Sequence, residues 1–330
     1  MPDTSIQIPA WEASSSVATN IAANLEVIDN ALLLPEVNSL ITAWGLVGPT
    51  DEPAEFLEWL SAVADEHWDF RRGRERNQVG EIKFSEAQNQ AIKDASTVLG
   101  LRTPTAPVRT HYDSIFVLGG LLRGCLTRWR TAKELVDAGL DVTAIIGLGG
   151  TRVLTSDEVE QGELLGVGGT TEFEAMTAAL RCTFSLRGSS AHTAYDDPNL
   201  PNANWAITSF DSSTPRLAIV AAPSSEPEKR RANTADTIEW WLQQSGSAQQ
   251  QSNLLITHQI YVPYQAAVAV CTLGLPKNTT VELVGVTKTA EDLGEITQRF
   301  EQHNYLQEIG STIRGYRQLR KALIDAQRLL

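Results

Sequence analysis

Two glycine pairs, each with an arginine close behind it, carry the clearest chemical signal in this sequence. Gly119-Gly120 precedes Arg123. Gly149-Gly150 is followed at once by Thr151 and Arg152. Glycines let a ligand approach the backbone closely, and an arginine can hold a carboxylate or phosphate through two parallel hydrogen bonds. A single glycine pair also makes an ordinary turn, but two pairs with nearby arginines favour a site for an anionic small molecule.

Two further residues are candidates for moving a proton at such a site. Glu172 lies at the start of a predicted helix, and His258 lies at the end of a predicted strand. A carboxyl group or an imidazole can act as a general acid or base when it lies within hydrogen-bonding reach of the reacting group. Both positions also have structural explanations, because helix starts favour acids and a histidine can simply be held by hydrogen bonds. Glu172 and His258 are therefore the candidate catalytic residues, with the structural alternative open for each.

Further candidate ligand contacts follow the third and fourth of five apolar runs. They are Arg231, Asn233, Thr234, Thr257, Tyr261 and Tyr264. Asn233 or Thr234 is also expected to cap the helix that follows, because the side-chain oxygens of these residue types accept hydrogen bonds from free backbone N–H groups.

Five short apolar runs, separated by helical patterns, must position these residues. The runs cover 114–119, 142–149, 216–222, 253–258 and 280–287, and the helical patterns cover 122–138, 171–185, 234–244 and 262–273. Short runs rich in β-branched residues suit strands that are buried on both faces, and strand–helix–strand repetition predicts a parallel sheet with right-handed crossovers. The predicted fold class is α/β, with a Rossmann-like parallel sheet of about five strands flanked by helices. The carboxyl ends of such strands meet at one edge, where the candidate residues would gather.

Three regions follow from the same pattern. Residues 1–110 are expected to form a helical cap or flank, 111–290 the Rossmann-like domain, and 291–330 a C-terminal helical extension. The stretch 185–205 is too long for an ordinary connection and is expected to be a lid or a surface insertion. The arginine-rich stretch 71–76 could hold a phosphate or carboxylate, although a solvated run of charges is the more common explanation.

Composition excludes several classes of function. The 330 residues carry a formal charge of −13, which disfavours nucleic acid as a partner. The three cysteines have no paired spacing, so neither a disulfide framework nor a metal site is expected. The glycine motifs of nicotinamide-binding and phosphate-binding loops are both missing from the sequence. With no basic start before an apolar run and no long apolar stretch, a cytoplasmic protein without a membrane segment is expected.

The order of these motifs resembles the SanA/YdcF-like family of bacterial α/β proteins, over roughly residues 113–286. The matching stretches are VLGG at 117–120, LGG at 148–150, EFEAM at 172–176, NTAD at 233–236 and LIT at 255–257. Where that family has a His-x-Pro-Arg stretch, this sequence has Tyr261-Val-Pro-Tyr264, so a detailed mechanism does not transfer. The resemblance implies a small-molecule site, and for the soluble YdcF-like members it implies binding of S-adenosylmethionine.

The leading expectation is a soluble enzyme that acts on a phosphate- or nucleoside-containing small molecule by hydrolysis or group transfer. One alternative is a protein that binds S-adenosylmethionine as its cofactor, or a methyltransferase. Another is a non-catalytic ligand sensor or assembly protein, in which the terminal helices make homo-oligomer contacts.

Overall fold

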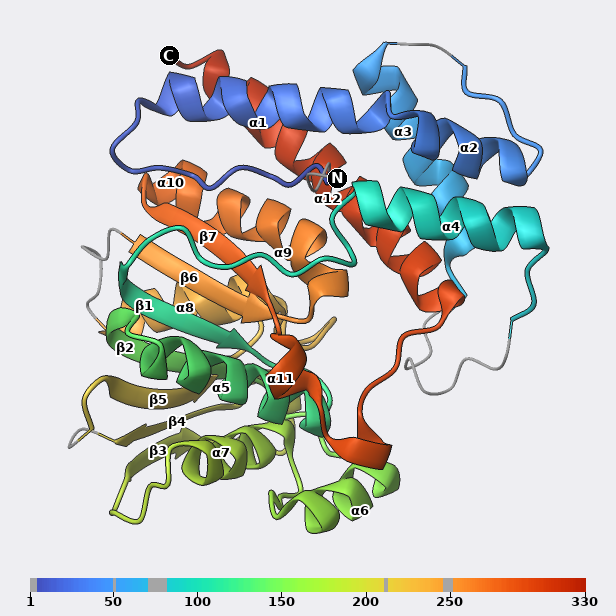
Figure 1. Ribbon diagram of the computed structural model, residues 1–330. Helices are drawn as coiled ribbons and strands as arrows, with labels where there is room; N and C mark the ends of the chain where they lie inside the picture. Colours follow the sequence, from blue (N-terminus) through green and yellow to red (C-terminus); the bar gives the residue numbers. More distant parts are fainter. Residues whose placement is uncertain (1–4, 50–51, 71–81, 211–212, 246–251) are drawn as a thin grey trace. The chain divides into compact units, whose positions relative to one another are not determined.

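A computed structural model describes residues 5–49, 52–70, 82–210, 213–245 and 252–330, which form two compact units (Figure 1). The helical unit comprises Met1–Thr105, Gln259–Asn278 and Arg299–Leu330. The α/β unit comprises Ala106–His258 and Thr279–Gln298. Both units are therefore built from segments that are distant in the sequence. The arginine-rich stretch 71–76 lies outside the described residues.

A seven-stranded sheet forms the α/β unit, in the order β3-β4-β5-β2-β1-β6-β7. Its strands are β1 (His111–Leu118), β2 (Asp141–Gly149), β3 (Ala191–Tyr195), β4 (Trp205–Phe210), β5 (Arg216–Ala221), β6 (Ser252–Thr257) and β7 (Thr280–Gly285). The five predicted strands are all present, and they pair with one another in parallel. The α/β fold class with a mostly parallel sheet is confirmed. Successive parallel strands are added on one side of β1 and then on the other, so the topological switch point lies between β1 and β6.

The stretch 185–205 is neither a lid nor a surface insertion, and that expectation was wrong. It contains β3 and leads into β4, and the two strands pair antiparallel to each other and extend the sheet beyond β5. Buried and half-buried residues alternate along β4, as expected for a strand with one covered face. The surrounding Ser, Asn, Pro and Asp residues concealed this pattern, and the sheet has seven strands rather than about five.

Helices cover both faces of the sheet. They are α5 (Leu122–Asp137), α6 (Ser156–Leu165), α7 (Glu172–Thr183), α8 (Thr234–Ser245) and the short α11 (Lys288–Glu291). Figure 1 shows α5 and α7 in front of the strands and α8 behind them. The buried side chains of α5 and α7 join those of the strands in one apolar core that includes Trp129, Ile145 and Met176. This packing fixes the ends of β1 and β2 relative to the helices that follow them.

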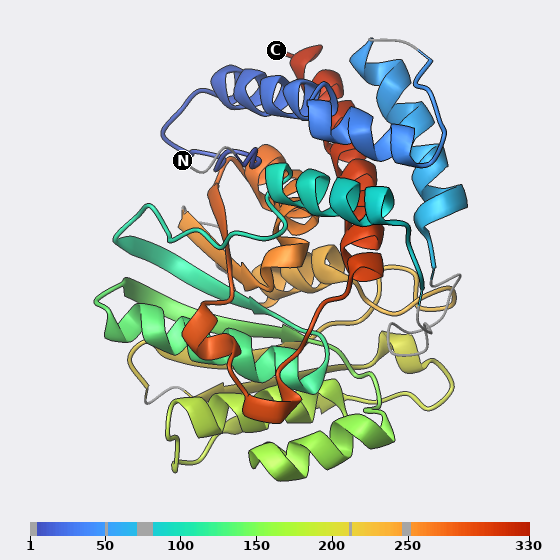
Figure 2. The same ribbon diagram turned by 45° about the vertical axis from the view of Figure 1, so that its right-hand side comes forward.

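The helical unit places long helices around α12 (Gln302–Gln327). Its other elements are α1 (Val17–Leu32), α2 (Pro35–Ala43), α3 (Pro53–Val63), a π-helix (Ala64–Trp68), α4 (Glu86–Val98), a 3-10 helix (Gln259–Tyr261), α9 (Val262–Ala269), a second π-helix (Val270–Gly274) and α10 (Leu275–Lys277). An apolar stripe along α12 is buried, with Ile309, Tyr316 and Leu323 nearly inaccessible. Figure 2 shows α12 running among the N-terminal helices.

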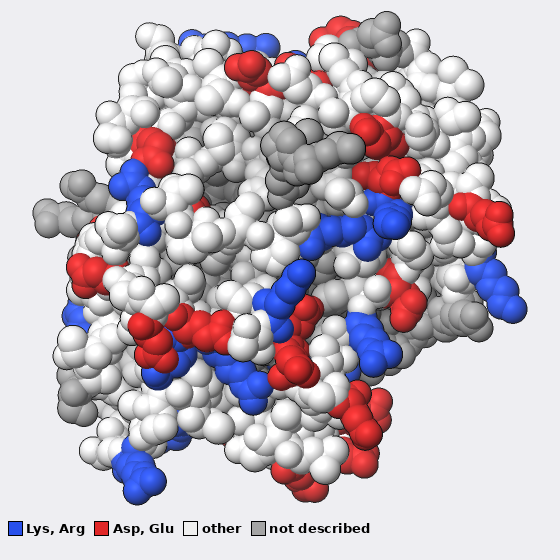
Figure 3. Space-filling view, in the orientation of Figure 1, with Lys and Arg blue, Asp and Glu red and all other residues white. Residues whose placement is uncertain are grey.

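Charged side chains are mixed on the surface. Figure 3 shows acidic and basic side chains close to one another over much of the face that it draws. Among the described residues, no single helix is long and apolar enough to span a membrane, while α1 and α2, bent by 43° at their junction, pass that test of length and composition as a pair.

Candidate functional site

The two predicted glycine pairs lie next to each other, because β1 and β2 are paired up to Leu118 and Leu148. A Cβ atom added to Gly119 would lie 2.6 Å from the Leu148 carbonyl oxygen and would also collide with the Glu172 carboxylate. A Cβ atom at Gly149 would lie 2.8 Å from the Met176 sulfur. The protein's own groups therefore fill the space that these two glycines leave open.

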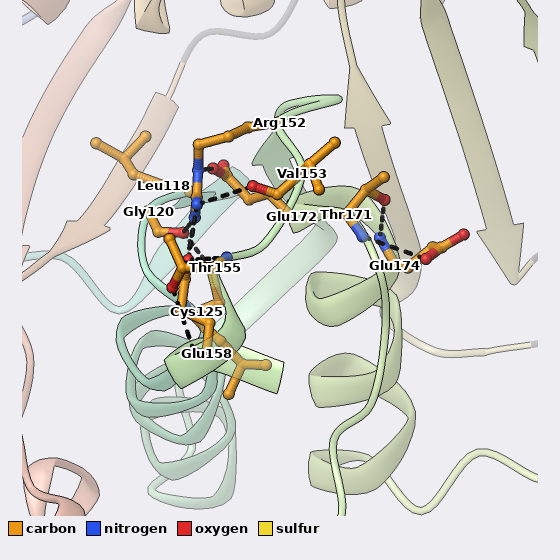
Figure 4. A network of polar contacts seen from close by, with 12 residues as sticks. Leu118, Gly120, Cys125, Arg152, Val153, Thr155, Glu158, Thr171, Glu172 and Glu174 are labelled. Atoms are coloured by element: carbon orange, nitrogen blue, oxygen red, sulfur yellow. Dashed lines mark hydrogen bonds and ion pairs between the residues drawn. The ribbon is translucent and has the colours of Figure 1, made fainter. Parts of the chain in front are cut away.

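Arg152 is the centre of a polar network at the ends of β1 and β2 (Figure 4). Its guanidinium donates two hydrogen bonds of 2.8 Å to the carboxylate of Glu158 and one of 3.3 Å to that of Glu172. The remaining contacts join it to the carbonyl oxygens of Gly120 and Val153, at 3.2 and 3.3 Å. All the donor nitrogens of Arg152 are thus engaged, so Arg152 holds the loops together and offers no spare donor to a ligand.

Glu158 is a member of this network that the sequence prediction missed. Besides Arg152, its carboxylate accepts hydrogen bonds from the backbone N–H of Leu122, which begins α5, and from Thr155. Burial would raise the pKa of Glu158, but the hydrogen bonds from Arg152 and Thr155 lower it to about 2. The sequence did contain a signal, because Thr155 and Glu158 have the spacing of a capping box, which forms at the start of α6.

Glu172 has the opposite electrostatic balance, although it contacts the same arginine. Its side chain is 13% exposed and lies at the N-terminus of α7. Burial raises the pKa of Glu172, and the charge and hydrogen bond of Arg152 only partly oppose this effect. The carboxyl of Glu172 therefore keeps a proton at a higher pH than an ordinary glutamate does, which is the property of a general acid.

A second buried arginine, Arg128 of α5, holds the end of β1 by hydrogen bonds. The sequence did not predict it as a site residue. It donates hydrogen bonds to the carbonyl oxygens of Leu118 and Gly119. It also donates to Nδ1 of His258, at 3.2 to 3.3 Å, and the Nε2 atom of that ring lies 3.3 Å from the hydroxyl oxygen of Thr127. Because arginine only donates, Nδ1 must be the accepting nitrogen. Both ring nitrogens of His258 are engaged, and the residue is buried.

Arg123 differs from both of these arginines. It lies in the first turn of α5, and its buried Nε has no hydrogen-bond partner among the described residues. Burial lowers its pKa, and the negative charge of nearby Glu158 works against this effect. Of the arginines predicted for the site, Arg123 at the strand ends has a buried N–H donor without a partner among the described residues.

The remaining predicted residues of the α/β unit serve local structure. The side chain of Asn233 accepts a hydrogen bond from the Asp236 backbone N–H at 3.0 Å, so Asn233 is the cap and Thr234 is the first residue of α8. Arg231 is exposed, and Arg230 instead forms the ion pair with Asp236. Two other predicted residues are the exposed Thr151 and the buried Thr257.

The predicted tyrosines belong to the helical unit. The ring of Tyr261 packs edge-on against Phe300, with 6.0 Å between ring centres. Tyr264 lies against Gly315 of α12. The structure therefore does not gather them with the strand-end residues inside the α/β unit. No group of three or more His, Cys, Asp or Glu side chains in the described residues has the arrangement of a metal site.

Comparison with known proteins gives one consistent result. A family model described as the Rv3785 N-terminal domain matches residues 15–100. The relatives include "Uncharacterized protein Rv3785" of Mycobacterium tuberculosis and "Uncharacterized protein Mb3814" of Mycobacterium bovis. Each is 33% identical over 252 residues, which cover 73% of this chain and 69% of the relative. No solved structure matches.

These matches overturn the resemblance to the SanA/YdcF-like family. Neither the family model nor any of the named relatives points to that family. The resemblance rested on short motifs at strand ends, and glycines and helix-capping residues occur at those places in many parallel sheets for purely local reasons. The matched family region 15–100 lies in the helical unit, outside the part of the chain that carried the resemblance.

Proposed function

The chain belongs to the Rv3785 family, and we propose that its α/β unit binds a phosphate- or nucleoside-containing small molecule at the carboxyl ends of β1 and β2. The ligand would then be hydrolysed or would transfer a group. The observation that carries the proposal is the unsatisfied buried donor of Arg123, which lies in the first turn of the helix that follows β1.

Topology supports the end of β1 as part of this location. Open parallel sheets bind ligands outside the carboxyl ends of their strands, at the point where the strand order reverses. Here that point lies between β1 and β6, and the loop from β1 into α5 contains Gly119 and Gly120 before Arg123. A planar guanidinium with donors to spare favours the oxygens of a phosphate or carboxylate.

Glu172 supports the catalytic part of the proposal. Its carboxyl is close to Gly119 and Gly150, so it lies at the ends of both central strands. Because burial raises its pKa, it can donate a proton to a leaving group and later take one back. Arg152 holds it in place through the 3.3 Å contact with its Nε. His258, whose ring nitrogens contact Arg128 and Thr127, has a positioning role in this proposal.

Calorimetric titration of the full chain with inorganic phosphate, AMP, ATP and S-adenosylmethionine tests the binding part. We expect Arg123→Ala to weaken binding of the phosphate-containing ligand by about ten- to a hundredfold, the range for one charged hydrogen bond. Arg187→Ala is the matched control, because Arg187 is an exposed arginine of the same unit and its loss changes the charge equally. Equal affinities of the two variants would refute the role of Arg123.

The same titrations separate the alternatives. Binding of S-adenosylmethionine without any phosphate ligand would favour a protein with that cofactor. If a ligand binds and is never turned over, the α/β unit is a sensor. If a ligand is turned over, Glu172→Gln tests the catalytic role of Glu172. The variant should keep the ligand affinity, and it should lower turnover only if Glu172 supplies the proton.

A further inference from the structure

One edge of the sheet in the α/β unit is exposed. The strand order puts β3 at one edge and β7 at the other (Figure 1). All six residues of β7 are buried, whereas all five residues of β3 are exposed. An edge strand turns a row of backbone N–H and C=O groups outward, where another strand can pair with them. β3 is therefore the edge of this sheet to which a further strand can be added.

The side chains of β3 do little to prevent such pairing. Edge strands are commonly protected by charged side chains, by proline or by a bulge. The sequence of β3, from Ala191 to Tyr195, contains no charged residue and no proline. Its register with β4 runs one to one along all five residues, without a bulge. The short length of β3 is the protection that remains, and it makes added pairing weak without preventing it.

The order of side chains in β3 fits a second copy of the same strand. In an antiparallel pair centred on Thr193, this residue faces its own copy, and threonine pairs are favourable across strands. The same register puts Tyr195, which is 50% exposed, opposite Ala191 of the partner subunit, so a large side chain meets a small one. His192 likewise lies opposite Ala194 of the partner subunit. Symmetry repeats both pairs, and no like charges meet within the five pairs.

Charges on either side of β3 favour the antiparallel direction. Arg187 precedes the strand and Asp196 follows it, and both residues are exposed. Asp197 adds a second acidic side chain at the same end. An antiparallel copy brings the basic end of one strand toward the acidic end of the other, whereas a parallel copy brings like charges together. A twofold axis at Thr193 also gives the closed symmetry that most homodimers have.

We propose that the chain forms a homodimer in which β3 pairs antiparallel with β3 of a second copy about Thr193. The two seven-stranded sheets then form one continuous sheet. Five cross-strand pairs bury less than a standard interface of about 1,600 Å², so the dimer is weak, with a dissociation constant in the micromolar range or above. Dimerisation through β3 is independent of ligand binding at the ends of β1 and β2.

Sedimentation velocity of the full chain, between about 10 and about 500 μM, tests the association. We expect a monomer–dimer equilibrium. Thr193→Lys puts two like charges opposite each other at the axis and should weaken the dimer about fivefold. Ala138→Lys is the matched control, because it adds the same charge at an exposed residue after α5. A chain that stays monomeric at every concentration, or a dimer that both variants weaken equally, would show the proposal to be wrong.

Disulfide cross-linking tests the register in a chain whose Cys182 and Cys271 are replaced by serine. Thr193→Cys should form a cross-linked dimer with copper–phenanthroline as oxidant, because facing residues of antiparallel strands have Cα atoms about 4.5–5.5 Å apart, within the range of a disulfide. Ala191→Cys is the control on the same strand, since its two copies would lie about 14 Å apart in this register. Electrophoresis without reductant measures both. Equal cross-linking of the two variants, or none with Thr193→Cys, would overturn the proposal.

Discussion

Arg152 contacts two carboxylates whose pKa values are shifted in opposite directions. For Glu158, the hydrogen bonds to the charged form outweigh burial and lower the pKa to about 2. For Glu172, burial dominates and raises the pKa. With side chains 17% and 5% exposed, Arg152 and Glu158 form a largely buried pair, in which solvent screening is weak. One arginine thus holds side by side a carboxylate whose pKa is lowered and one whose pKa is raised.

This difference predicts the stability of two matched variants. Glu158→Gln should lower the free energy of unfolding by about 3 kcal/mol at pH 7, because it leaves Arg152 without its bidentate partner. Glu172→Gln should change it by less than about 1 kcal/mol, because the amide resembles the protonated acid that burial favours. Urea unfolding followed by circular dichroism measures both. Equal losses in the two variants would contradict the assignment.

The pH dependence should also differ in sign. A lowered pKa means that Glu158 stabilises the fold above the unfolded value of about 4.5, and that this contribution is lost as the pH falls toward 2. The raised pKa of Glu172 acts in reverse, favouring the fold at low pH and losing that effect as the pH rises through the raised value. The gap between wild type and Glu158→Gln should therefore shrink between pH 5 and pH 3.

At the scale of elements, the close approach of α5 and α7 to β2 depends on a glycine, Gly147, in that strand. A Cβ atom at Gly147 of β2 would lie 2.6 Å from Ile219 and 2.7 Å from the ring of Trp129, and 3.0 Å from Met176. These atoms belong to β5, α5 and α7, so the glycine sets how tightly both helices pack on the sheet. The same packing brings Glu172 to the end of β1.

Gly147→Ala should consequently destabilise the protein by about 2 kcal/mol, since overpacking a core by one methyl group costs roughly 1–3 kcal/mol. Gly168→Ala is the matched control, because an added Cβ atom there meets nothing within 4 Å. Thermal unfolding of the two variants compares them directly. A Gly147→Ala protein as stable as Gly168→Ala would mean that the helices have room to shift.

At the scale of the molecule, the core of each unit forms only when segments that are distant in the sequence pack together. The helical unit needs α12, whose Leu306, Ile309 and Leu319 are almost completely buried, together with N-terminal helices that end at Val98, far earlier in the chain. The α/β unit contains no part of α12. The two units should therefore respond differently when α12 is removed.

Truncation after Glu301 should abolish protection of α1 to α4 against hydrogen–deuterium exchange, because the apolar stripe of α12 is lost from their core. Protection of β1 and β2 should persist. A shorter truncation after Gln327, which removes only the last three exposed residues, is the control. If α1 to α4 remain protected without α12, the helical unit does not depend on it.

The sequence by itself determined the five parallel strands and the glycine pairs at the ends of β1 and β2. These features are local, since a buried strand needs a short apolar run and a close approach of backbones needs glycine. It did not determine β3, whose five residues are all exposed and carry no apolar pattern. Burial of side chains along such a strand contributes little, so pairing with β4 alone marks it as part of the sheet.

Only the tertiary structure decided what the charged residues do. Arg123 and Arg152 look alike in the sequence, each following a glycine pair, yet Arg152 is fully engaged by Glu158 and Glu172 while Arg123 keeps a buried donor without a partner. Likewise, Arg128 contacts His258 although 130 residues separate them. The physical reason is that an ion pair or a hydrogen bond depends on distances of a few ångströms between atoms, and folding sets these distances independently of separation along the chain.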